Sequence, residues 1–540
     1  MVAAIDFGTT YSGYAFSFRN DYERNPLKIN MNFHLGSRTS IMSVKAPTAV
    51  LFDDRKQLHS FGYEAEDTYY ELVAENEHRD WCFFRKFKMK LYTEKVCITF
   101  VLQHVKVIFM KLARYYGDTY QILTVPAIWT DQAKQFMREA ANKAGIENGN
   151  LSIALEPEAA SIYCQAIDVD RDHRFATIHA GTKYMVIDLG GGTVDITVHE
   201  KQSDGGLKEL FKASGGAWGG TRVDEEFNKL IISIFGEEVF RKFCNESKED
   251  YLDLQREFET KKKQTEKSDR KLTVRISFKL LEIYRQETRI TIETSIRESK
   301  YYGKITWFGD KLRIEHDVLN GLFKPCCDNI VRHISHLLEN AAVKGTSVFM
   351  MVGGFSNCQI VQNAIKRAFP SVKVIIPELA QLAVLKGAVI FGHRPLAISS
   401  RISKYTYGVS ISPLFDSSIH PEFRRVVING NDRCRDVFKK YIYAGKNVRE
   451  GDARSWKLTT LWPRQKKIKL KIYESTRPNT MYVDEEGTKY IGAVDIRLPE
   501  IDELSVVNVK MMFGETELMV EVTELSRNQI FSAHFDFPRT

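Results

Sequence analysis

The sequence lacks the features that mark membrane-spanning, secreted and disulfide-bonded proteins. The apolar stretch 96–110 is interrupted by Gln103, His104 and Lys106, so it is a poor candidate for a helix that crosses a bilayer. The first residues meet an acid at Asp6, too early for the apolar core of a signal peptide. The eight cysteines form no C-x-x-C pair, which fits neither a disulfide framework nor a zinc cluster. These absences predict a cytoplasmic protein without a membrane span, with the nucleus as a second location.

A block of charge of one sign is also missing. The 77 basic and 69 acidic residues give a formal charge of +8, but the basic residues are scattered along the chain. A nucleic-acid surface would gather them into a patch or stripe, so we expect no nucleic-acid partner. The composition, 43% hydrophobic and 27% charged, is typical of a globular protein. At 540 residues the chain is too long for one hydrophobic core, so two to four packing units are expected.

An internal repeat is the strongest organising signal that is present. Residues 2–10 and 186–193 each join a short apolar run to an aspartate, Asp6 or Asp188, and then to a turn rich in glycine and threonine. A stretch of alternating polarity follows each turn. The repeat therefore predicts two related lobes, each opening with a strand, a tight turn and a second strand.

Strands and helices are expected to alternate around these repeats. The predicted strands are 122–125, 153–155 and 348–352, and the predicted helices are 131–145, a helix begun by Pro157, 223–235, 251–267 and 319–342. The stretch 272–313 alternates in polarity and is predicted to form a small sheet. This order predicts an α/β fold.

From residue 405 onward a period of two dominates, notably in 467–473, 493–498, 506–513 and 517–522. We therefore expect a mostly antiparallel β-domain at 405–540 after a linker at 393–404. The first domain is expected at 1–392, with lobes at about 1–185 and 186–392. The chain that follows the last predicted strand is too short for a helical lid.

The two repeated turns have the chemistry of a phosphate site. Glycine removes the β-carbon that would block approach, so that successive backbone N–H groups can converge on phosphate oxygens. Thr9, Thr10 and Thr193 can add hydroxyl donors. One such turn alone is usually only a hairpin, but two at corresponding places in two lobes favour a shared function.

Asp6 and Asp188 each end a predicted buried strand, where an unpaired carboxylate would be costly unless a cation or water meets it. Mg²⁺ suits this arrangement because it keeps several waters and takes few direct carboxylate ligands, so we expect metal linkage mostly through water. The alternative is that each aspartate only caps its own turn.

Glu156 stands at a predicted strand-to-helix junction, immediately before Pro157. From this position a carboxylate can point into a cleft and orient or activate an attacking water. The alternative is that Glu156 is only a helix cap.

Five motifs occur in an order that resembles one known family: Ile5–Gly13 with its Asp-x-Gly-x-Thr turn, Thr124-Val-Pro-Ala127, Glu156-Pro-Glu-Ala-Ala160, Ile187–Asp195 with its three glycines, and Val352-Gly-Gly354. They resemble the 70-kDa heat-shock family, and most closely its divergent heat shock 70 kDa protein 12 branch. The resemblance implies an actin-like ATPase fold of two duplicated, ribonuclease H-like lobes, followed by a β-sandwich.

Several site residues are implied by this resemblance. The expected phosphate and nucleotide contacts are Gly8, Thr9, Thr10, Tyr11, Gly190, Gly191, Gly192, Thr193, Gly219, Gly220, Gly353 and Gly354, with metal linkage through Asp6 and Asp188. The family's cleft lysine, which steadies the transferred phosphate, falls in Phe84-Arg-Lys-Phe-Lys88; Lys86 is slightly favoured over Lys88.

For the adenosine end, the segment 258–263 resembles a family helix that contacts the ribose and stacks on the base. Glu259, Lys262 and Lys263 are the expected contacts, although a lysine run on a helix is often only a solvated surface. After Gly354 the family has small polar residues and an arginine, whereas Phe355, Ser356 and Asn357 stand here. The base pocket is therefore expected to be rebuilt around Phe355 and Asn357.

The leading interpretation is a chaperone-like switch that binds ATP or ADP with Mg²⁺ and hydrolyses ATP slowly. Its β-domain would bind a protein client or signalling partner, and the resemblance implies co-chaperones and nucleotide-exchange factors as further partners. Two alternatives stay open: an ATP-binding scaffold with little hydrolysis, and a small-molecule kinase of the same fold. The stretch 395–404 is more basic and less apolar than the family's linker, which predicts altered coupling between nucleotide and client.

Overall fold

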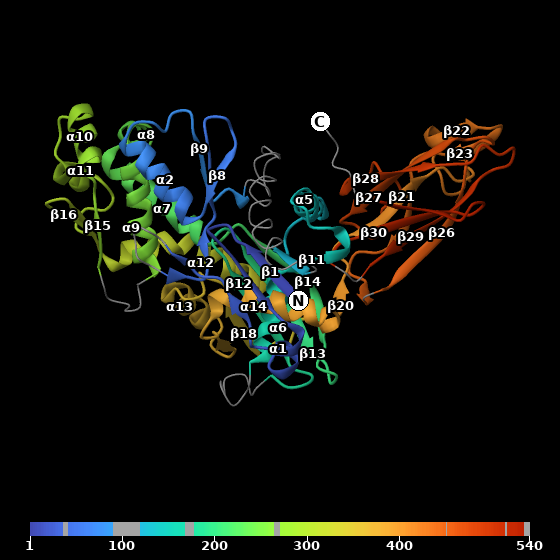
Figure 1. The fold of residues 1–540 in the computed structure, drawn as a ribbon, viewed down its shortest axis with the longest axis horizontal. Coiled ribbons are helices and arrows are strands. Elements are labelled where there is room, and N and C mark those ends of the chain that lie inside the picture. The colour runs from blue at the N-terminus through green and yellow to red at the C-terminus, as the bar shows by residue number, and fades with distance from the viewer. Residues whose placement is uncertain are drawn as a thin grey trace. The chain divides into compact units, whose positions relative to one another are not determined.

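The structure, a computed structural model, describes residues 1–35, 42–89, 119–167, 178–263, 271–449, 451–513 and 516–533. The chain divides into two units (Figure 1). The first unit contains Met1–Ile128, Lys143–Thr197 and Ser214–Arg394. The second contains Trp129–Asn142, Val198–Ala213 and Pro395–Thr540. Two segments that the sequence analysis assigned to the first domain, Trp129–Asn142 and Val198–Ala213, thus belong to the second unit.

The first repeat lies in the central sheet of the first unit. Its strands follow the order β11 (Leu151–Leu155), β10 (Tyr120–Val125), β1 (Val2–Phe7), β2 (Tyr11–Ser17) and β3 (Asn30–Met31), and β6 (Ala46–Pro47) also pairs with β2. β1 is parallel to β10 and antiparallel to β2. All of β1 is buried, as expected for a central strand with neighbours on both edges.

The second repeat has the same local topology. Its strands follow the order β19 (Lys373–Ile375), β18 (Val348–Val352), β12 (Lys183–Leu189) and β13 (Val194–Lys201). β12 is parallel to β18, as β1 is parallel to β10, and it turns directly into β13 as β1 turns into β2. The register places Asp6 opposite Thr124 and Asp188 opposite Val352. The two aspartates therefore occupy equivalent positions in the two sheets.

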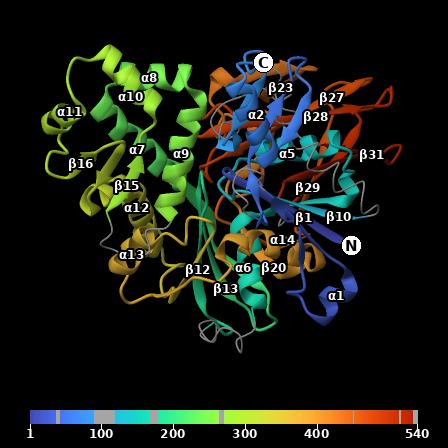
Figure 2. The same cartoon turned by 60° about the vertical axis from the view of Figure 1, so that its left-hand side comes forward.

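Two helices of the first unit pack closely against each other, and this packing positions Glu156 at the start of the first helix. α6 (Glu156–Ala166) follows β11 directly, with Pro157 in its first turn, and it packs against α14 (Ala383–His393) (Figure 2). A β-carbon on Gly387 would lie 1.7 Å from the Ala159 carbonyl oxygen, so only glycine permits this approach. Because α14 also packs on β1, Glu156 is held near the end of that strand.

The remaining secondary structure of the first unit is helical with short strands. The helices are α1 (Arg19–Arg24), α2 (Tyr63–Ala74), α7 (Gly220–Phe235), α8 (Glu237–Glu246), α9 (Lys248–Lys263), α10 (Phe278–Glu287), α11 (Ile292–Glu298), α12 (His316–Leu338) and α13 (Gln359–Ala368). The strands are β4 (His34–Leu35), β5 (Met42–Ser43), β7 (Ala49–Phe52), β8 (Leu58–Phe61), β9 (Cys82–Arg85), β15 (Leu272–Arg275), β16 (Ile305–Phe308) and β17 (Lys311–Ile314).

The prediction of a small sheet throughout 272–313 is wrong in part. β15, β16 and β17 do form a sheet, but α10 and α11 lie between β15 and β16 in the sequence. Each helix begins at a residue whose hydroxyl accepts a hydrogen bond from the backbone of its first turn, Ser277 from Leu280 N and Thr291 from Thr294 N. These N-caps outweigh the apparent alternation in polarity.

The second unit contains antiparallel sheets, as expected from the period of two. One sheet has the order β24 (Val437–Ile442), β21 (Thr406–Ile411), β27 (Lys467–Ser475) and β28 (Thr488–Arg497), and another has β26 (Ala453–Thr459), β29 (Val506–Met512), β30 (Met519–Glu524) and β31 (Gln529–Ala533). β22 (Arg425–Ile428) and β23 (Asn431–Cys434) form a hairpin. Apolar residues of both larger sheets, including Val409, Ile472 and Val509, form one buried core.

Part of the predicted linker is itself a strand of the second unit. β20 (Ile398–Ile402) pairs in parallel with β14 (Leu207–Gly216) and antiparallel with β25 (Asn447–Arg449). α5 (Asp131–Lys143) also belongs to this unit, because Tyr407 Oη donates to Asp131 Oδ2 at 2.5 Å and Arg138 Nε donates to Glu517 Oε1 at 2.9 Å. In the described parts of the chain, no helix combines the length and apolar character needed to cross a membrane.

Candidate functional site

The two glycine and threonine turns contact each other directly. A β-carbon built on Gly191 would lie 1.9 Å from Thr10 Oγ1, and one on Gly192 would lie 2.6 Å from Thr9 Oγ1. Real β-carbons essentially never approach a heavy atom this closely, and a β-carbon on Gly191 would also lie 2.9 Å from Thr10 Cβ, so position 191 requires glycine in this arrangement. At position 192 the neighbouring atoms are side-chain atoms of Thr9 and Met89. The turns that the internal repeat singled out, about 180 residues apart in the sequence, therefore form one site.

The first turn is held by Thr48, which follows β6. The Thr48 hydroxyl donates to the Gly8 carbonyl at 2.7 Å, and the Thr48 backbone N–H donates to the Thr10 carbonyl at 2.9 Å. Gly8 itself is tightly turned, because a β-carbon there would lie 2.2 Å from the Tyr11 carbonyl oxygen. These contacts fix the turn without using the hydroxyl groups of Thr9 or Thr10.

The second turn is held by the beginning of α7. Backbone N–H groups of Gly219, Gly220 and Thr221 donate to the carbonyls of Gly192, Gly190 and Gly191 at 3.2, 3.1 and 2.7 Å, respectively. A β-carbon on Gly219 would lie 2.7 Å from the Gly190 carbonyl oxygen. The predicted residues Gly219 and Gly220 thus support the glycine turn from behind, satisfying its carbonyl groups.

Four buried carboxylates lie near the two turns: Asp6, Glu156, Asp188 and Asp195. Asp6 accepts from Lys45 Nζ at 2.5 Å and from Thr124 Oγ1 at 3.2 Å. Asp195, only 1% exposed, accepts from the Ile128 backbone N–H at 2.9 Å. The strand ends of both lobes therefore direct acidic side chains into one region.

These carboxylates perturb one another's protonation. Burial raises the pKa of Glu156 from 4.5 to about 7; Lys88 opposes this rise, and Asp6 and Asp195 add to it. Burial also raises the pKa of Asp188 well above its ordinary value, and repulsion from Glu156, Asp195 and Asp6 adds to that rise. The cluster thus concentrates negative charge that a cation would stabilise.

The two candidate lysines contact different acids. Lys88, with a side chain 2% exposed, lies 2.6 Å from Glu156 Oε1. Lys86 lies 3.0 Å from Asp224 Oδ2 and 3.5 Å from Glu259 Oε2. Lys86 has a φ of 54°, so a left-handed residue directly after β9 turns the chain between the two lysines. The lysine beside the predicted catalytic glutamate is Lys88, whereas the sequence slightly favoured Lys86.

The residues expected at the adenosine end form a second charged cluster. Lys262 Nζ donates to the Gly220 carbonyl at 3.1 Å and forms an ion pair with Asp224. Glu259 is buried and lies 3.8 Å from Arg85 as well as near Lys86. Burial raises the pKa of Tyr11 far above its ordinary value, and the charge of Glu259 adds to the rise, which places Tyr11 beside this cluster. The Lys263 side chain is outside the described residues.

The loop after β18 contributes Gly353, Gly354, Phe355 and Asn357. Gly353 has a φ of 84°, and a β-carbon there would lie 2.4 Å from Asp188 Oδ1, so this loop contacts the second aspartate. Phe355 is buried, and its backbone N–H donates to the Leu189 carbonyl. Asn357 is exposed, and its amide lies 3.5 Å from Gln381 Oε1. Phe355 therefore faces inward at this end of the site, while Asn357 lies at the surface.

Four charged residues of these clusters were missed as site candidates: Asp195, Asp224, Lys45 and Arg85. Asp224 could have been noticed, because it interrupts the otherwise apolar buried face of α7. Asp195 shares its face of β13 with Thr197 and His199, and it is unusual only because that polar face is buried. Lys45 gives no such signal, since its contact with Asp6 depends on the pairing of β6 with β2.

The arrangement fits a cation held through water. Four potential negative charges face the ammonium groups of Lys45 and Lys88, which contact Asp6 and Glu156. Among the residues with described placement, no three His, Cys, Asp or Glu side chains group closely enough to hold a metal ion directly. A divalent ion that keeps its waters matches such an acidic but loosely spaced set.

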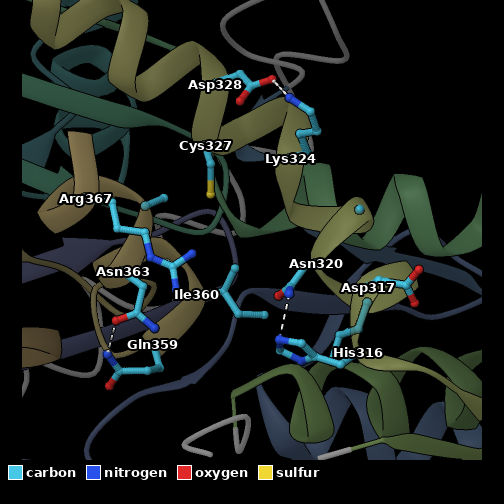
Figure 3. A pocket seen from close by; sticks show the side chains of 13 residues that line it. His316, Asp317, Asn320, Lys324, Cys327, Asp328, Gln359, Ile360, Asn363 and Arg367 are labelled. Carbon is cyan, nitrogen blue, oxygen red and sulfur yellow. Dashed lines mark hydrogen bonds and ion pairs between the residues drawn. The ribbon is translucent and has the colours of Figure 1, made fainter. Parts of the chain in front are cut away.

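A separate cavity of about 400 Å³ lies between α12 and α13 (Figure 3). Lys324 is paired with Asp328 at 2.6 Å, His316 is bonded to Asn320 at 2.7 Å, and the Arg367 side chain extends into the cavity. None of the predicted site residues is among the 13 residues drawn along its wall. The cavity is therefore distinct from the contact between the two turns.

The raised carboxylate pKa values predict that stability falls as pH rises. Between pH 4.5 and about 7 the folded chain keeps the Glu156 proton, whereas the unfolded chain releases it. The resulting contribution to the unfolding free energy is fully present below pH 4.5 and is lost as the pH rises through about 7. Compared with Glu156→Gln, the wild type should lose about 2 to 3 kcal/mol of unfolding free energy between pH 5 and 8. Denaturant titrations in EDTA would measure this difference, and parallel pH profiles of the two proteins would contradict it.

Comparison with known proteins gives consistent matches. The family described as Hsp70 protein matches residues 37–393. Human heat shock 70 kDa protein 12A is 32% identical over 622 aligned residues, covering 99% of this chain and 91% of the relative. Human heat shock 70 kDa protein 12B is 32% identical over 629 residues, with the same coverage of 99% and 91%. A solved structure, MreB5 of Spiroplasma citri bound to ADP, has a TM-score of 0.47 and 14% identity, covering 72% of this chain and 95% of that chain.

Proposed function

Because the chain belongs to the Hsp70 protein family, we propose that its first unit binds ATP and ADP with Mg²⁺ and hydrolyses ATP slowly. The chain has the actin-like ATPase fold of that family, followed by antiparallel sheets. The observation that carries the proposal is the contact between the two turns, because Gly191 can lie against Thr10 only as a glycine. Two such turns facing one ligand provide backbone donors from both lobes.

The proposed phosphate contacts are the residues of these turns, namely Gly8, Thr9, Thr10, Tyr11, Gly190, Gly191, Gly192 and Thr193. Their carbonyl groups are in part engaged by Thr48 and by the start of α7, which leaves the turns rigid before a ligand arrives. Such preorganisation lowers the entropic cost of binding a polyphosphate.

Asp6, Asp188 and Asp195 are the proposed metal-linked carboxylates, acting mostly through water. Their burial and mutual repulsion make an added cation favourable, and Lys45 supplies part of the compensating charge. When bound, Mg²⁺ neutralises charge on the phosphate oxygens. Asp195 joins the two aspartates of the sequence analysis because it is the second residue of β13, just after the glycine turn that follows Asp188, and its charge adds to the raised pKa of Asp188.

Glu156 and Lys88 are the proposed catalytic pair. Glu156 begins α6 at the mouth of the first lobe, and a carboxylate with a pKa of about 7 can both accept and release a proton near neutral pH. We propose that Glu156 orients the attacking water. Lys88, at 2.6 Å from Glu156, is proposed to steady the transferred phosphoryl group, in the place for which Lys86 was slightly favoured.

The second unit is the proposed binding region for a protein client or a signalling partner. Its antiparallel sheets offer edge strands on which an extended segment could pair. In this proposal the bound nucleotide controls that interaction, and co-chaperones or exchange factors act on the first unit. A cytoplasmic location, with the nucleus as a second compartment, stays a prediction.

Titration calorimetry and single-turnover hydrolysis test this function together. We expect ATP and ADP to bind in Mg²⁺ buffer, and Glu156→Ala to slow single-turnover hydrolysis by about 100-fold while nucleotide affinity changes little. Gln165, in the same helix, bonds to Tyr184, and Gln165→Ala provides a control that keeps Glu156. The proposal fails if neither ATP nor ADP binds.

A scaffold that binds nucleotide with little turnover is the second candidate function. It is favoured by the adenosine end, where Lys262 and Glu259 already have partners within the chain. Equal and near-zero hydrolysis rates in the wild type and in Glu156→Ala, with nucleotide binding preserved, would favour the scaffold over the ATPase.

A further inference from the structure

The Phe355 ring is buried at the end of the site where adenosine contacts are expected. Its side chain is 8% exposed, and its ring stacks on Phe323 of α12, with centroids 6.2 Å apart and an interplanar angle of 17°. On another side, a β-carbon on Gly220 would lie 3.5 Å from a Phe355 ring carbon, so the ring packs on the start of α7. Because protein interiors are close-packed, a second flat ring would have to displace the Phe355 ring.

The backbone keeps Phe355 in this position. Its N–H donates at 2.9 Å to the carbonyl of Leu189, the last residue of β12, and the N–H of Gly353, two residues earlier, donates to the Ala380 carbonyl at 2.9 Å. The Ser356 hydroxyl is bonded to the Gly353 carbonyl at 2.7 Å. The loop is thus tied to the strand that carries Asp188, and the ring cannot leave without breaking its packing on Phe323.

The polar groups around the ring are engaged within the protein. Lys262 Nζ is bonded to the Gly220 carbonyl and to Asp224, and Asp224 also accepts from Lys86. Glu259 lies near Lys86 and Arg85. A base is distinguished by hydrogen bonds to its exocyclic groups, and discrimination is strong only where a site offers polar partners to those groups. Phe355 offers none, and its charged neighbours already have partners.

We infer that Phe355 closes the base subsite, so that the chain recognises the polyphosphate of its ligand and distinguishes poorly among nucleobases. This inference rests on the proposed function and specifies its ligand class as Mg²⁺-bound polyphosphates, including inorganic triphosphate. The phosphates contact the two turns, while the base lies outside the space that the Phe355 ring occupies. Phe355 is therefore the residue that prevents strong discrimination among bases.

Titration calorimetry of the full chain with Mg²⁺ and ATP, GTP or inorganic triphosphate tests the inference. The wild type is expected to bind all three with affinities within about threefold of one another. Phe355→Ser should open space beside Phe323 and raise the affinities for ATP and GTP by about tenfold relative to inorganic triphosphate, since a base can then stack there. Phe355→Leu, which keeps an apolar group in the space, should preserve the wild-type ratios.

The outcomes separate this inference from the function on which it rests. ATP binding to the wild type more than about tenfold tighter than both GTP and inorganic triphosphate would overturn the inference and leave the proposed function standing. Identical affinity ratios in Phe355→Ser and Phe355→Leu would also overturn it. If none of the three ligands binds, the proposed function falls and the inference with it. Should Phe355→Ser fail to fold, the wild-type ratios alone decide.

Discussion

Replacing Gly191 by alanine is expected to abolish the binding of nucleotide and to destabilise the first unit. The added β-carbon would lie 1.9 Å from Thr10 Oγ1 and 2.9 Å from Thr10 Cβ, so the two turns would have to separate. We expect the affinity for Mg²⁺·ATP to fall by more than about 100-fold, because backbone donors from the two turns could no longer converge on the same oxygens. Overpacking of this kind should lower the unfolding free energy by about 2 kcal/mol. Calorimetry and denaturant titration would measure the two effects.

A matched control and a rescue make this prediction specific. Gly149→Ala adds the same methyl group where nothing lies within 4 Å, and it should change neither affinity nor stability appreciably. Thr10→Gly combined with Gly191→Ala removes the clashing atoms, so the double variant should recover most of the lost unfolding free energy. Wild-type binding by Gly191→Ala would show that the turns do not close on a shared ligand.

The positions of Asp6 and Asp188 could be predicted from the sequence because they depend on local structure. In each case an apolar strand, an acid and a glycine turn follow directly in the chain, and the register of β1 with β10 and of β12 with β18 then places the acids equivalently. The start of α6 could be predicted for the same reason, since Pro157 is favoured in a first helical turn. The family resemblance added the expectation that the two turns share one ligand.

The contacts that the sequence did not predict depend on distant parts of the chain or on one dihedral angle. Lys86 and Lys88 are two residues apart; the left-handed conformation of Lys86 turns the chain between them, and Lys88 is the lysine that meets Glu156. Lys45 reaches Asp6 because β6 pairs with β2, a pairing of two residues with little signal of its own. The helices α10 and α11 were missed because hydroxyl caps at Ser277 and Thr291 override a pattern that alternates in polarity.

The sequence shows that Phe355 replaces a small polar residue of the family, but it does not show where the Phe355 ring lies. Phe355 in place of a small polar residue predicts a rebuilt pocket, and an aromatic side chain could equally have stacked on a bound base from outside. Instead the ring is buried against Phe323 and Gly220, and we propose that it occupies the space that a base would need. The difference arises from α12, whose Phe323 is separated from Phe355 by 32 residues and has no local relation to it.

Lys88→Met is expected to be the most damaging change of a single lysine in the site. Lys88 is the lysine bonded to Glu156, and removing one partner of a buried ion pair leaves an uncompensated charge, with a cost of about 3 kcal/mol in unfolding free energy at pH 8. At pH 6 the cost should be smaller, because burial already favours a protonated Glu156 and loss of Lys88 favours it further. Single-turnover hydrolysis should fall by about 100-fold, as expected on removal of a donor to the transferred phosphoryl group.

Lys86→Met provides the matched comparison. It removes the same ammonium group at a position two residues before Lys88, where the contacted acids keep other partners. Asp224 remains paired with Lys262, and Glu259 remains near Arg85, so neither acid is left isolated. We expect Lys86→Met to cost about 1 kcal/mol or less and to leave single-turnover hydrolysis within about threefold of the wild type. If instead Lys86→Met abolished hydrolysis while Lys88→Met retained it, the phosphoryl contact would belong to Lys86, as the sequence slightly favoured, and the pairing of Lys88 with Glu156 would be structural.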